Sequence, residues 1–378
     1  MLTGCTHRSD AAPRATTTGA TSRSAAASVS PRATAGPRTV TILGSGDVLI
    51  HPALWQQAAS DAHAEGRGGY DFAPMFASVA PVTRAADLAV CELEGPLASP
   101  AGPFVGYPTF SMPPQVLTAL VGAGYDSCTT ASNHTLDDGT VGIDRTLDEL
   151  DAAGLRHTGS ARTAAEANTP LIVTEPNGVR IAQLAYTFGF NGNALPAGQP
   201  WRANLTDVAT ILAAAHRAKL AGADIVVLSM HWGVEYNTGV TATQRQQAAQ
   251  LLASPDIDLI LGDHPHVVEP FAKLGSKWVV YSMGNQVARH DDPVTPSREG
   301  VMPRFTFTET TPGRFEVTRA QALTTWMQFD PYRVVDVAAG LADPSTPAAL
   351  RAELSQTRGD LTPVLDALGA DQAGLQIS

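Results

Sequence analysis

The sequence lacks the features of several classes of protein. Only three of its 378 residues are cysteine, too few for a disulfide-rich scaffold. No apolar stretch approaches the roughly 20 residues that span a bilayer. No Lys- or Arg-rich run occurs after residue 37 and the net charge is −11, so nucleic acid is not an expected partner. No Gly-x-Ser-x-Gly motif is present, which argues against a serine nucleophile on a strand-to-helix turn.

The amino terminus carries a short signal of its own. Leu2-Thr3-Gly4-Cys5 matches a bacterial lipobox, in which Cys5 becomes the lipidated residue. The basic start and apolar core of a signal peptide are missing before it. Residues 6–37 are rich in Ala, Thr, Ser, Arg and Pro, the composition of a flexible tether. We expect Met1 to lie inside a longer reading frame and the protein to be extracytoplasmic, anchored to the cell membrane by lipid alone; a chance match is the alternative.

The other two cysteines fall in apolar segments. Cys91 and Cys128 each lie near the end of a predicted core strand. We expect buried free thiols, the usual state of such residues, and a disulfide between adjacent strand ends is the alternative.

Strand and helix patterns alternate through the middle of the chain. Helices are predicted at 140–153, closed by Gly154, at 206–220, closed by Gly222, and at 241–253, opened by a Thr cap. Strands are predicted at 171–174, 180–186, 224–230 and 257–262. This order indicates an α/β fold with largely parallel strands and helices outside.

The pattern changes after about residue 300. Residues 304–308 and 314–318 are predicted to form an antiparallel pair. Thr346 and Pro347 resemble the cap and first residue of a helix that extends to Leu368, with a break near Gly359.

Five β-prone segments end in groups that can bind metal. These segments are 40–47, 88–95, 126–139, 226–233 and 259–266. Because the carboxyl ends of neighbouring parallel strands meet at one edge of a sheet, the groups are expected to converge. Carboxylate, amide and imidazole ligands suit two divalent transition-metal ions such as Mn, Fe or Zn, and exclude a thiolate-rich zinc site. Glu94 is the expected bridging carboxylate of a two-metal centre.

Six motifs in order resemble the bacterial capsule-synthesis CapA family, a branch of the calcineurin-like metallophosphatases. They cover roughly residues 39–290: Gly46-Asp47, Leu93-Glu94-x-Pro96, Asn133-His134-x-x-Asp137-x-Gly139, His231-Trp232-Gly233-x-Glu235-Tyr236, His264-Pro265-His266 and Tyr281-Ser282-x-Gly284-Asn285.

The resemblance implies a four-layer α/β/β/α sandwich and assigns roles to individual residues. The implied metal ligands are Asp47, Glu94, Asn133, His231, His264 and His266. His134 is expected to contact the substrate or protonate the leaving group, and Asp137 to orient His134 by a hydrogen bond. Glu235, Tyr236 and His51 are candidates for substrate contact, each with a structural role as the alternative. His63, His157 and His216 are not expected to be ligands.

The sequence departs from the family pattern at four positions. Glu92 stands where the family usually has Asn, Asp263 where a His is common, and Gln286 where an aromatic follows Gly-Asn. Leu49 fills the His position of the Asp-x-His motif of typical metallophosphatases. Single-metal occupancy or weak catalysis is therefore the alternative to a fully occupied two-metal centre.

These observations predict three parts and a function. The parts are a lipobox remnant and tether (1–37), a CapA-like metallophosphatase domain (38–310) and a C-terminal extension of strands and helices (311–378). The expected function is capsule or poly-γ-glutamate synthesis or export, with hydrolysis of phosphoesters by direct attack of water. Expected partners are a phosphoester or an anionic capsule polymer and membrane-bound ligase or export proteins. The alternative is a non-catalytic accessory protein that binds a polyanion.

Overall fold

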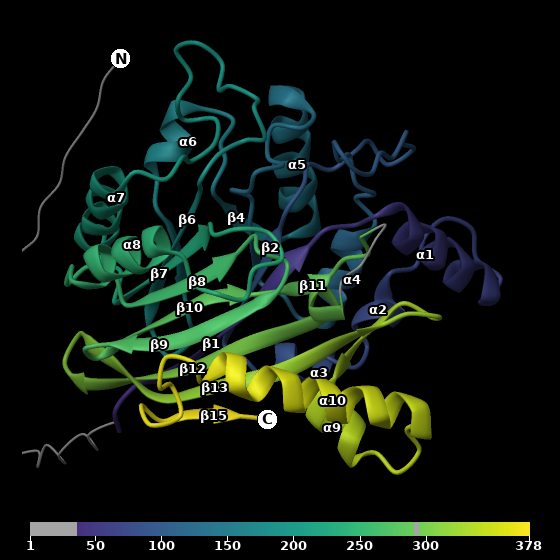
Figure 1. Ribbon diagram of the computed structural model, residues 1–378. Helices are drawn as coiled ribbons and strands as arrows, with labels where there is room; N and C mark the ends of the chain where they lie inside the picture. Colours follow the sequence, from purple (N-terminus) through teal and green to yellow (C-terminus); the bar gives the residue numbers. More distant parts are fainter. Residues whose placement is uncertain (1–35, 291–294) are drawn as a thin grey trace, which may run out of the picture. The chain divides into compact units, whose positions relative to one another are not determined.

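The computed structural model describes residues 36–290 and 295–378 (Figure 1). Cys5 and the predicted tether up to residue 35 lie outside this part of the chain. The described residues form two β-sheets, with helices on their outer faces. None of the described helices combines the length and the apolar character that crossing a membrane requires.

The first sheet mixes parallel and antiparallel strands. β1 to β4 are parallel neighbours, whereas β12 to β14 continue from β1 as antiparallel neighbours. In spatial order the strands are β14 (Arg333–Asp336), β13 (Arg314–Gln328), β12 (Glu299–Thr311), β1 (Thr39–Val48), β2 (Leu88–Leu93), β3 (Ser127–Thr129) and β4 (Arg156–Thr158). β11 (Asn285–Val287) pairs with β1, and β15 (Leu375–Ile377) pairs with β13.

The second sheet has a parallel centre and antiparallel edges. Its order is β5 (Leu171–Thr174), β6 (Arg180–Thr187), β7 (Ile225–His231), β8 (Leu259–Asp263), β10 (Lys277–Met283) and β9 (Val268–Leu274). β6, β7, β8 and β10 run parallel, as the alternation of strands and helices predicts.

Apolar side chains on both faces of each sheet create four layers. Ile42 of β1 packs in the core between the sheets with Val227 and Leu261, while its neighbour Leu43 faces the opposite side. That opposite side is covered by α1 (Pro52–Ala64), α2 (Ala73–Phe76), α3 (Ala80–Arg84), α4 (Val116–Ala123) and α5 (Gly139–Ala153). α7 (Val208–Leu220) and α8 (Ala242–Leu252) cover the outer face of the second sheet. The predicted α/β/β/α sandwich is confirmed.

All but one of the helix ends predicted between residues 140 and 253 are found to within one residue. α5 ends at Ala153, and Gly154 follows with φ 78°, the left-handed conformation that suits glycine. α8 begins with a capping box between Thr241 and Gln244. α7 starts two residues later than predicted, where the Asp207 side chain accepts a hydrogen bond from the amide of Thr210. A short helix, α6 (Ala164–Asn168), precedes β5.

The C-terminal part differs from prediction in one helix. After the 3-10 turn Thr295–Arg298, β12 and β13 form the predicted antiparallel pair, and α9 (Val337–Ala342) and α10 (Ala348–Leu365) follow. The predicted break near Gly359 is wrong, because α10 continues past it. Leu354, Leu361 and Leu365 on this helix are fully or almost fully buried, and this packing outweighs the low helix propensity of glycine. Pro347 is the N-cap rather than the first helical residue.

Cys91 and Cys128 form a disulfide, so the expectation of free thiols is wrong. The two residues are direct partners in the register of β2 and β3, with Cα atoms 4.5 Å apart. That separation is within the range a disulfide needs.

The two sheets are joined at Gly284. β10 of the second sheet ends at Met283, Gly284 adopts φ 67°, and β11 begins the next residue in the first sheet. The amide of Asp47 donates a hydrogen bond to the Gly284 carbonyl over 3.1 Å. A Cβ on Gly46 would lie 1.8 Å from that same oxygen, so only glycine allows this close approach.

Candidate metal centre

The carboxyl ends of strands from both sheets meet at one edge of the sandwich. Asp47 lies near the end of β1, Glu94 directly follows β2, and Asn133 follows β3. His231 is the last residue of β7, and His264 and His266 follow β8. The structure brings all six predicted ligands together.

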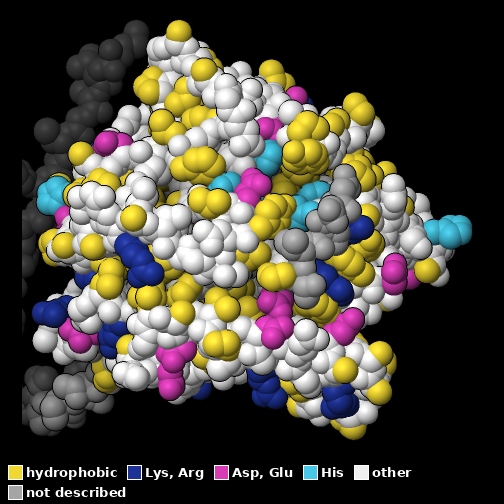
Figure 2. All heavy atoms as spheres, viewed as in Figure 1, with side chains coloured by type: hydrophobic (Ala, Val, Ile, Leu, Met, Phe, Trp, Pro, Cys, Tyr) yellow, Lys and Arg dark blue, Asp and Glu magenta, His cyan; other side chains and the backbone are white. Residues whose placement is uncertain are grey.

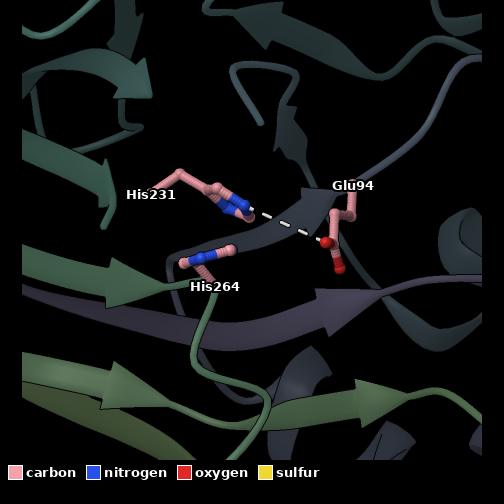
Figure 3. A group of neighbouring side chains, drawn as sticks. All are labelled: Glu94, His231 and His264. Atoms are coloured by element: carbon pink, nitrogen blue, oxygen red, sulfur yellow. Dashed lines mark ion pairs between the residues drawn. The ribbon is translucent and has the colours of Figure 1, made fainter. Parts of the chain in front are cut away.

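Glu94 occupies the middle of this cluster. Its Oε1 lies 3.6 Å from His266 Nε2 and 3.9 Å from His231 Nε2. Figure 3 shows His231 and His264 on one side and Glu94 facing them. Three overlapping groups have ligand atoms within 4.8 Å of one another: Glu94, His231 and His264; Asp47, Glu94 and His266; Asp47, Glu92 and His231. Asp47, Glu94 and His231 each belong to two of the groups, and Glu94, whose Oε1 lies near the rings of both His231 and His266, has the position expected of a bridging carboxylate.

Further contacts fix the imidazoles. His266 Nδ1 lies 3.1 Å from Asp47 Oδ2 and 2.9 Å from Asn285 Oδ1. The backbone amide of His264 donates to Asp47 Oδ1 over 3.3 Å, and His231 Nε2 lies 2.9 Å from Asn133 Oδ1. His264 and His266 have φ values of 96° and 56°, uncommon for a residue with a side chain.

The carboxylates of the cluster are buried and short of partners. Among the described residues, both oxygens of Glu92 and Glu94 and one of Asp263 are buried without a hydrogen-bond partner. Burial and then neighbouring acids raise the pKa of Glu92 and Asp263 well above the usual value. Burial raises the pKa of Glu94 to about 8. Buried carboxylates with unused lone pairs are a donor set that divalent cations satisfy.

The histidines differ in their protonation. Burial, followed by the neighbouring imidazoles, lowers the pKa of His231 well below its usual value and that of His264 to about 3, so both rings are neutral and can donate a lone pair. Burial also lowers the pKa of His266, but Glu94 and Asp47 outweigh that effect and raise it to about 10. His266 therefore carries a proton beside two acids, and a cation would compete with that proton.

His134 and Asp137 form a hydrogen-bonded pair next to the cluster. His134 Nδ1 lies 2.6 Å from Asp137 Oδ2, which also accepts from the amide of Phe110 over 2.7 Å. The predicted hydrogen bond is confirmed. Burial lowers the pKa of His134, but Asp137 and Glu94 outweigh it, and the net pKa is raised.

The predicted substrate contacts lie at different depths. Tyr236 is half-exposed, and its Oη is 3.1 Å from His290 Nδ1. Glu235 is exposed beside it. His51 is buried next to the cluster, with its ring centroid 4.8 Å from that of His290 and its Nδ1 3.0 Å from the Leu49 carbonyl oxygen.

The histidines not expected to be ligands lie outside the cluster. His157 pairs with Asp151 and His216 with Asp256, while His63 is exposed on α1.

Sequence reasoning missed three neighbours of the cluster. The Asn191 side chain contacts Asn133 and His134 over 3.3 and 3.4 Å. The Phe188 ring lies 4.5 Å from that of His264, and His290 lies 4.6 Å from His266. These residues lie on loops after β6 and β11, and no local pattern marks them.

Two of the four departures from the family pattern contribute acids here. Glu92 Oε1 is 3.7 Å from His231 Nδ1, and the pKa of the buried Asp263 responds to Asp47 and Glu94. Leu49, in contrast, is buried in the apolar core. Compared with the family pattern, the chain thus lacks the imidazole expected at position 49 and has two further carboxylates, Glu92 and Asp263, at the edge where the candidate ligands meet.

Comparison with known proteins gives relatives of two kinds. PGA biosynthesis protein CapA of Bacillus subtilis is 30% identical over 250 residues, 65% of this chain and 64% of the relative. Capsule biosynthesis protein CapA of Bacillus anthracis is 29% identical over 46% of this chain and 42% of the relative. A probable polyglutamine synthesis accessory protein of Mycobacterium tuberculosis is 26% identical, over 47% and 49%. The chain thus spans less than two thirds of the length of each.

Among solved structures, calcineurin-like phosphoesterase YfkN from Bacillus subtilis has a TM-score of 0.46 and 14% identity, covering 86% of this chain and 98% of that one. A 5'-nucleotidase precursor from Thermus thermophilus has the same TM-score and identity, covering 86% and 60%. A family model for the bacterial capsule synthesis protein PGA_cap matches residues 41–290, which is more than half of the chain. The chain therefore belongs to the PGA_cap family of bacterial capsule synthesis proteins, the CapA family.

Proposed function

We propose that this protein is a metal-dependent phosphoester hydrolase that serves the synthesis or export of a capsule polymer. The observation that supports it most is the set of buried, unpartnered carboxylates facing two neutral imidazoles. No lysine or arginine in the described part of the chain forms an ion pair with these acids. In their ionised form these acids would therefore require bound cations.

The residues divide into ligands and a proton donor. Asp47, Glu94, Asn133, His231, His264 and His266 would hold two divalent ions, with Glu94 between them. Such ions activate water and neutralise phosphoryl oxygens. His134, held by Asp137, would protonate the leaving oxygen, and its raised pKa keeps the proton available. The two described cysteines are bonded to each other, so water and not a thiol is the proposed nucleophile.

The link to a polymer comes from relatives. The Bacillus subtilis relative is named for PGA biosynthesis and the mycobacterial one for polyglutamine synthesis. We extend this role to the present chain, with membrane-bound ligase or export proteins as partners.

An extracytoplasmic, lipid-anchored location belongs to the same proposal. The Cys91–Cys128 disulfide supports it, since such bonds persist in oxidising compartments. Expressed from an upstream start that includes a signal sequence, the protein should fractionate with membranes, and Cys5→Ser should release it. Membrane association that survives Cys5→Ser would contradict the lipid anchor.

Metal analysis and a hydrolysis assay test the central claim. Residues 38–378, loaded with manganese, iron or zinc, should bind about two ions per chain and hydrolyse an aryl phosphate. Absence of bound metal after all three incubations would refute the metal centre. Bound metal without turnover on any phosphoester would instead favour a non-catalytic polyanion-binding protein, an alternative that Leu49 in the Asp-x-His position supports.

A further inference from the structure

Exposed hydrophobic side chains gather around the metal centre. The described residues include nine large hydrophobic side chains that are exposed, and five of them lie on the loops at residues 94–112, 187–200 and 231–241. These five are Val105, Tyr107, Phe188, Val234 and Tyr236. Figure 2 shows histidine and acidic side chains near the centre of one face with hydrophobic side chains around them. Such clustering beside a site exceeds the scattered exposure of an ordinary surface.

Two of these aromatic residues contact the candidate ligands directly. Phe188 is 49% exposed, yet its ring lies 4.5 Å from that of His264 and stacks parallel to that of His231 at 6.4 Å. Tyr236 is 44% exposed, and its ring lies 6.0 Å from that of His266. Each ring therefore has one side on the metal centre and another open to a ligand.

The loops that surround the candidate metal centre carry almost no positive charge. The segments 45–51, 94–112, 130–139, 187–200, 231–241, 262–268 and 284–290 contain no lysine and a single arginine, Arg289. The guanidinium of Arg289 packs over the Phe329 ring at 5.4 Å. Apart from the metals, a polymer with an acid on every unit would find only Arg289 as a cationic side chain in these segments.

We propose that Phe188 and Tyr236 form a subsite, the aromatic rim, for an apolar leaving group attached to the phosphoryl group. The preferred substrate is then a phosphomonoester of an aromatic or long aliphatic alcohol rather than a polyanion. The proposal rests on the proposed metal-dependent function and specifies its substrate class. Contact with a ring adds to the gain from burying apolar surface, and both favour such a leaving group.

Non-hydrolysable phosphonates test this preference. Methylphosphonate, phenylphosphonate and octylphosphonate would be titrated calorimetrically into the manganese-loaded protein, with a poly-γ-glutamate oligomer as a fourth ligand. We expect phenyl- or octylphosphonate to bind at least about tenfold more tightly than methylphosphonate. Phe188→Ala, and separately Tyr236→Ala, should reduce this advantage to about threefold or less at unchanged metal content. Leu220→Ala, an exposed apolar residue at the end of α7, is the control and should change nothing.

The outcomes separate this inference from the proposed function. A larger gain for the phenyl than for the octyl compound identifies an aryl leaving group, and the reverse identifies a lipid. Equal affinity for all three phosphonates, no binding of any, tighter binding of the oligomer, or an advantage that survives both rim variants would overturn the subsite. Hydrolysis of phosphoesters without a preference for phenyl- or octylphosphonate would refute the aromatic rim and leave the proposed hydrolase intact. A preference for phenyl- or octylphosphonate without hydrolysis of any phosphoester would support the aromatic rim and refute the proposed hydrolase.

Discussion

The two sheets contribute opposite chemistry to one site. The first sheet provides the acid half, Asp47, Glu92 and Glu94, from the ends of β1 and β2. The second provides the imidazole half, His231, His264 and His266, from the ends of β7 and β8. The acids repel one another when buried, and two of the imidazoles are neutral. The second sheet also carries one acid, Asp263 at the end of β8, so the division is incomplete, and cations between the two halves would satisfy the acids and the imidazoles together.

The largest expected effect separates a shared ligand from a terminal one. Glu94→Ala should reduce metal content from about two ions to near none and abolish turnover, because the Glu94 carboxylate lies between His231 and His266 and belongs to two of the ligand groups. His264→Ala, which touches one group, should cost about one ion. Elemental analysis of the purified variants measures both.

Glu92 is the control for that assignment. It belongs to a single group and contacts His231 at the Nδ1 atom. If Glu92→Ala empties both positions and Glu94→Ala does not, the bridging role belongs to Glu92.

A second prediction concerns chemistry without metal loss. His134 lies outside the three ligand groups, so His134→Ala should leave metal content unchanged and lower the hydrolysis rate by about 10²–10⁴. Asp137→Asn should lower the rate less, since it alters only the orientation of the ring. Parallel loss of metal and rate in His134→Ala would make it a ligand.

A third prediction concerns the contribution of the Cys91–Cys128 disulfide to stability. This bond links β2 to β3 of the first sheet and spans 37 residues of sequence, so its loss should affect the acid half directly. Cys91→Ala/Cys128→Ala should lower the free energy of unfolding by roughly 2–4 kcal/mol in urea denaturation. Reductant should destabilise the wild type similarly and leave the double variant unaffected. A variant as stable as the wild type would show that packing of the strands suffices.

The smallest effect is on pH dependence in metal-stripped protein. The pKa of Glu94 is raised to about 8, so the folded protein keeps a proton that the unfolded chain has already released, and stability falls as the pH rises toward 8. The pKa of His266 is raised to about 10, which lowers stability over the same pH range for the same reason. Glu92 and Asp263, whose pKa is also raised, act in that direction too, whereas His231 and His264, whose pKa is lowered, oppose the fall only near pH 6.5, where the unfolded imidazoles are still partly protonated. The free energy of unfolding should therefore fall by about 2 kcal/mol between pH 6.5 and 8.

Urea denaturation at the two pH values measures this fall, and Glu94→Gln should reduce it. Metal-loaded protein should show no such fall, because cations bind deprotonated ligands more tightly as the pH rises. A rise in stability of the stripped protein over this range would contradict the pKa directions.

Local sequence signals predicted most of the fold and the strand ends at which the candidate ligands lie. Apolar runs ending in Asp47, in Asn133 and in His264-Pro265-His266 lie at strand ends as predicted. Caps such as Thr241 are equally local, because one side chain satisfies backbone groups a few residues away.

Features set by long-range packing could not be predicted. Phe188 and Asn191 reach the site only because β6 lies beside β7, and nothing in their own loop indicates a partner. Gly359 suggested a break that the burial of Leu361 and Leu365 overrides. The Cys91–Cys128 bond depends on strand register, which neither segment encodes alone.

At Gly284 the chain returns from the second sheet to the first, and this return shows that one sheet is inserted into the other in the sequence. The second sheet comes from one continuous stretch, β5 to β10, whereas the first sheet comes from the segments before and after it. The second sheet is thus an insertion into a host formed by β1–β4 and β11–β15. The host keeps the acids Asp47, Glu92 and Glu94, and the insertion contains His231, His264 and His266. Excising the insertion would leave a host without these imidazoles, so the candidate metal centre requires host and insertion to fold together.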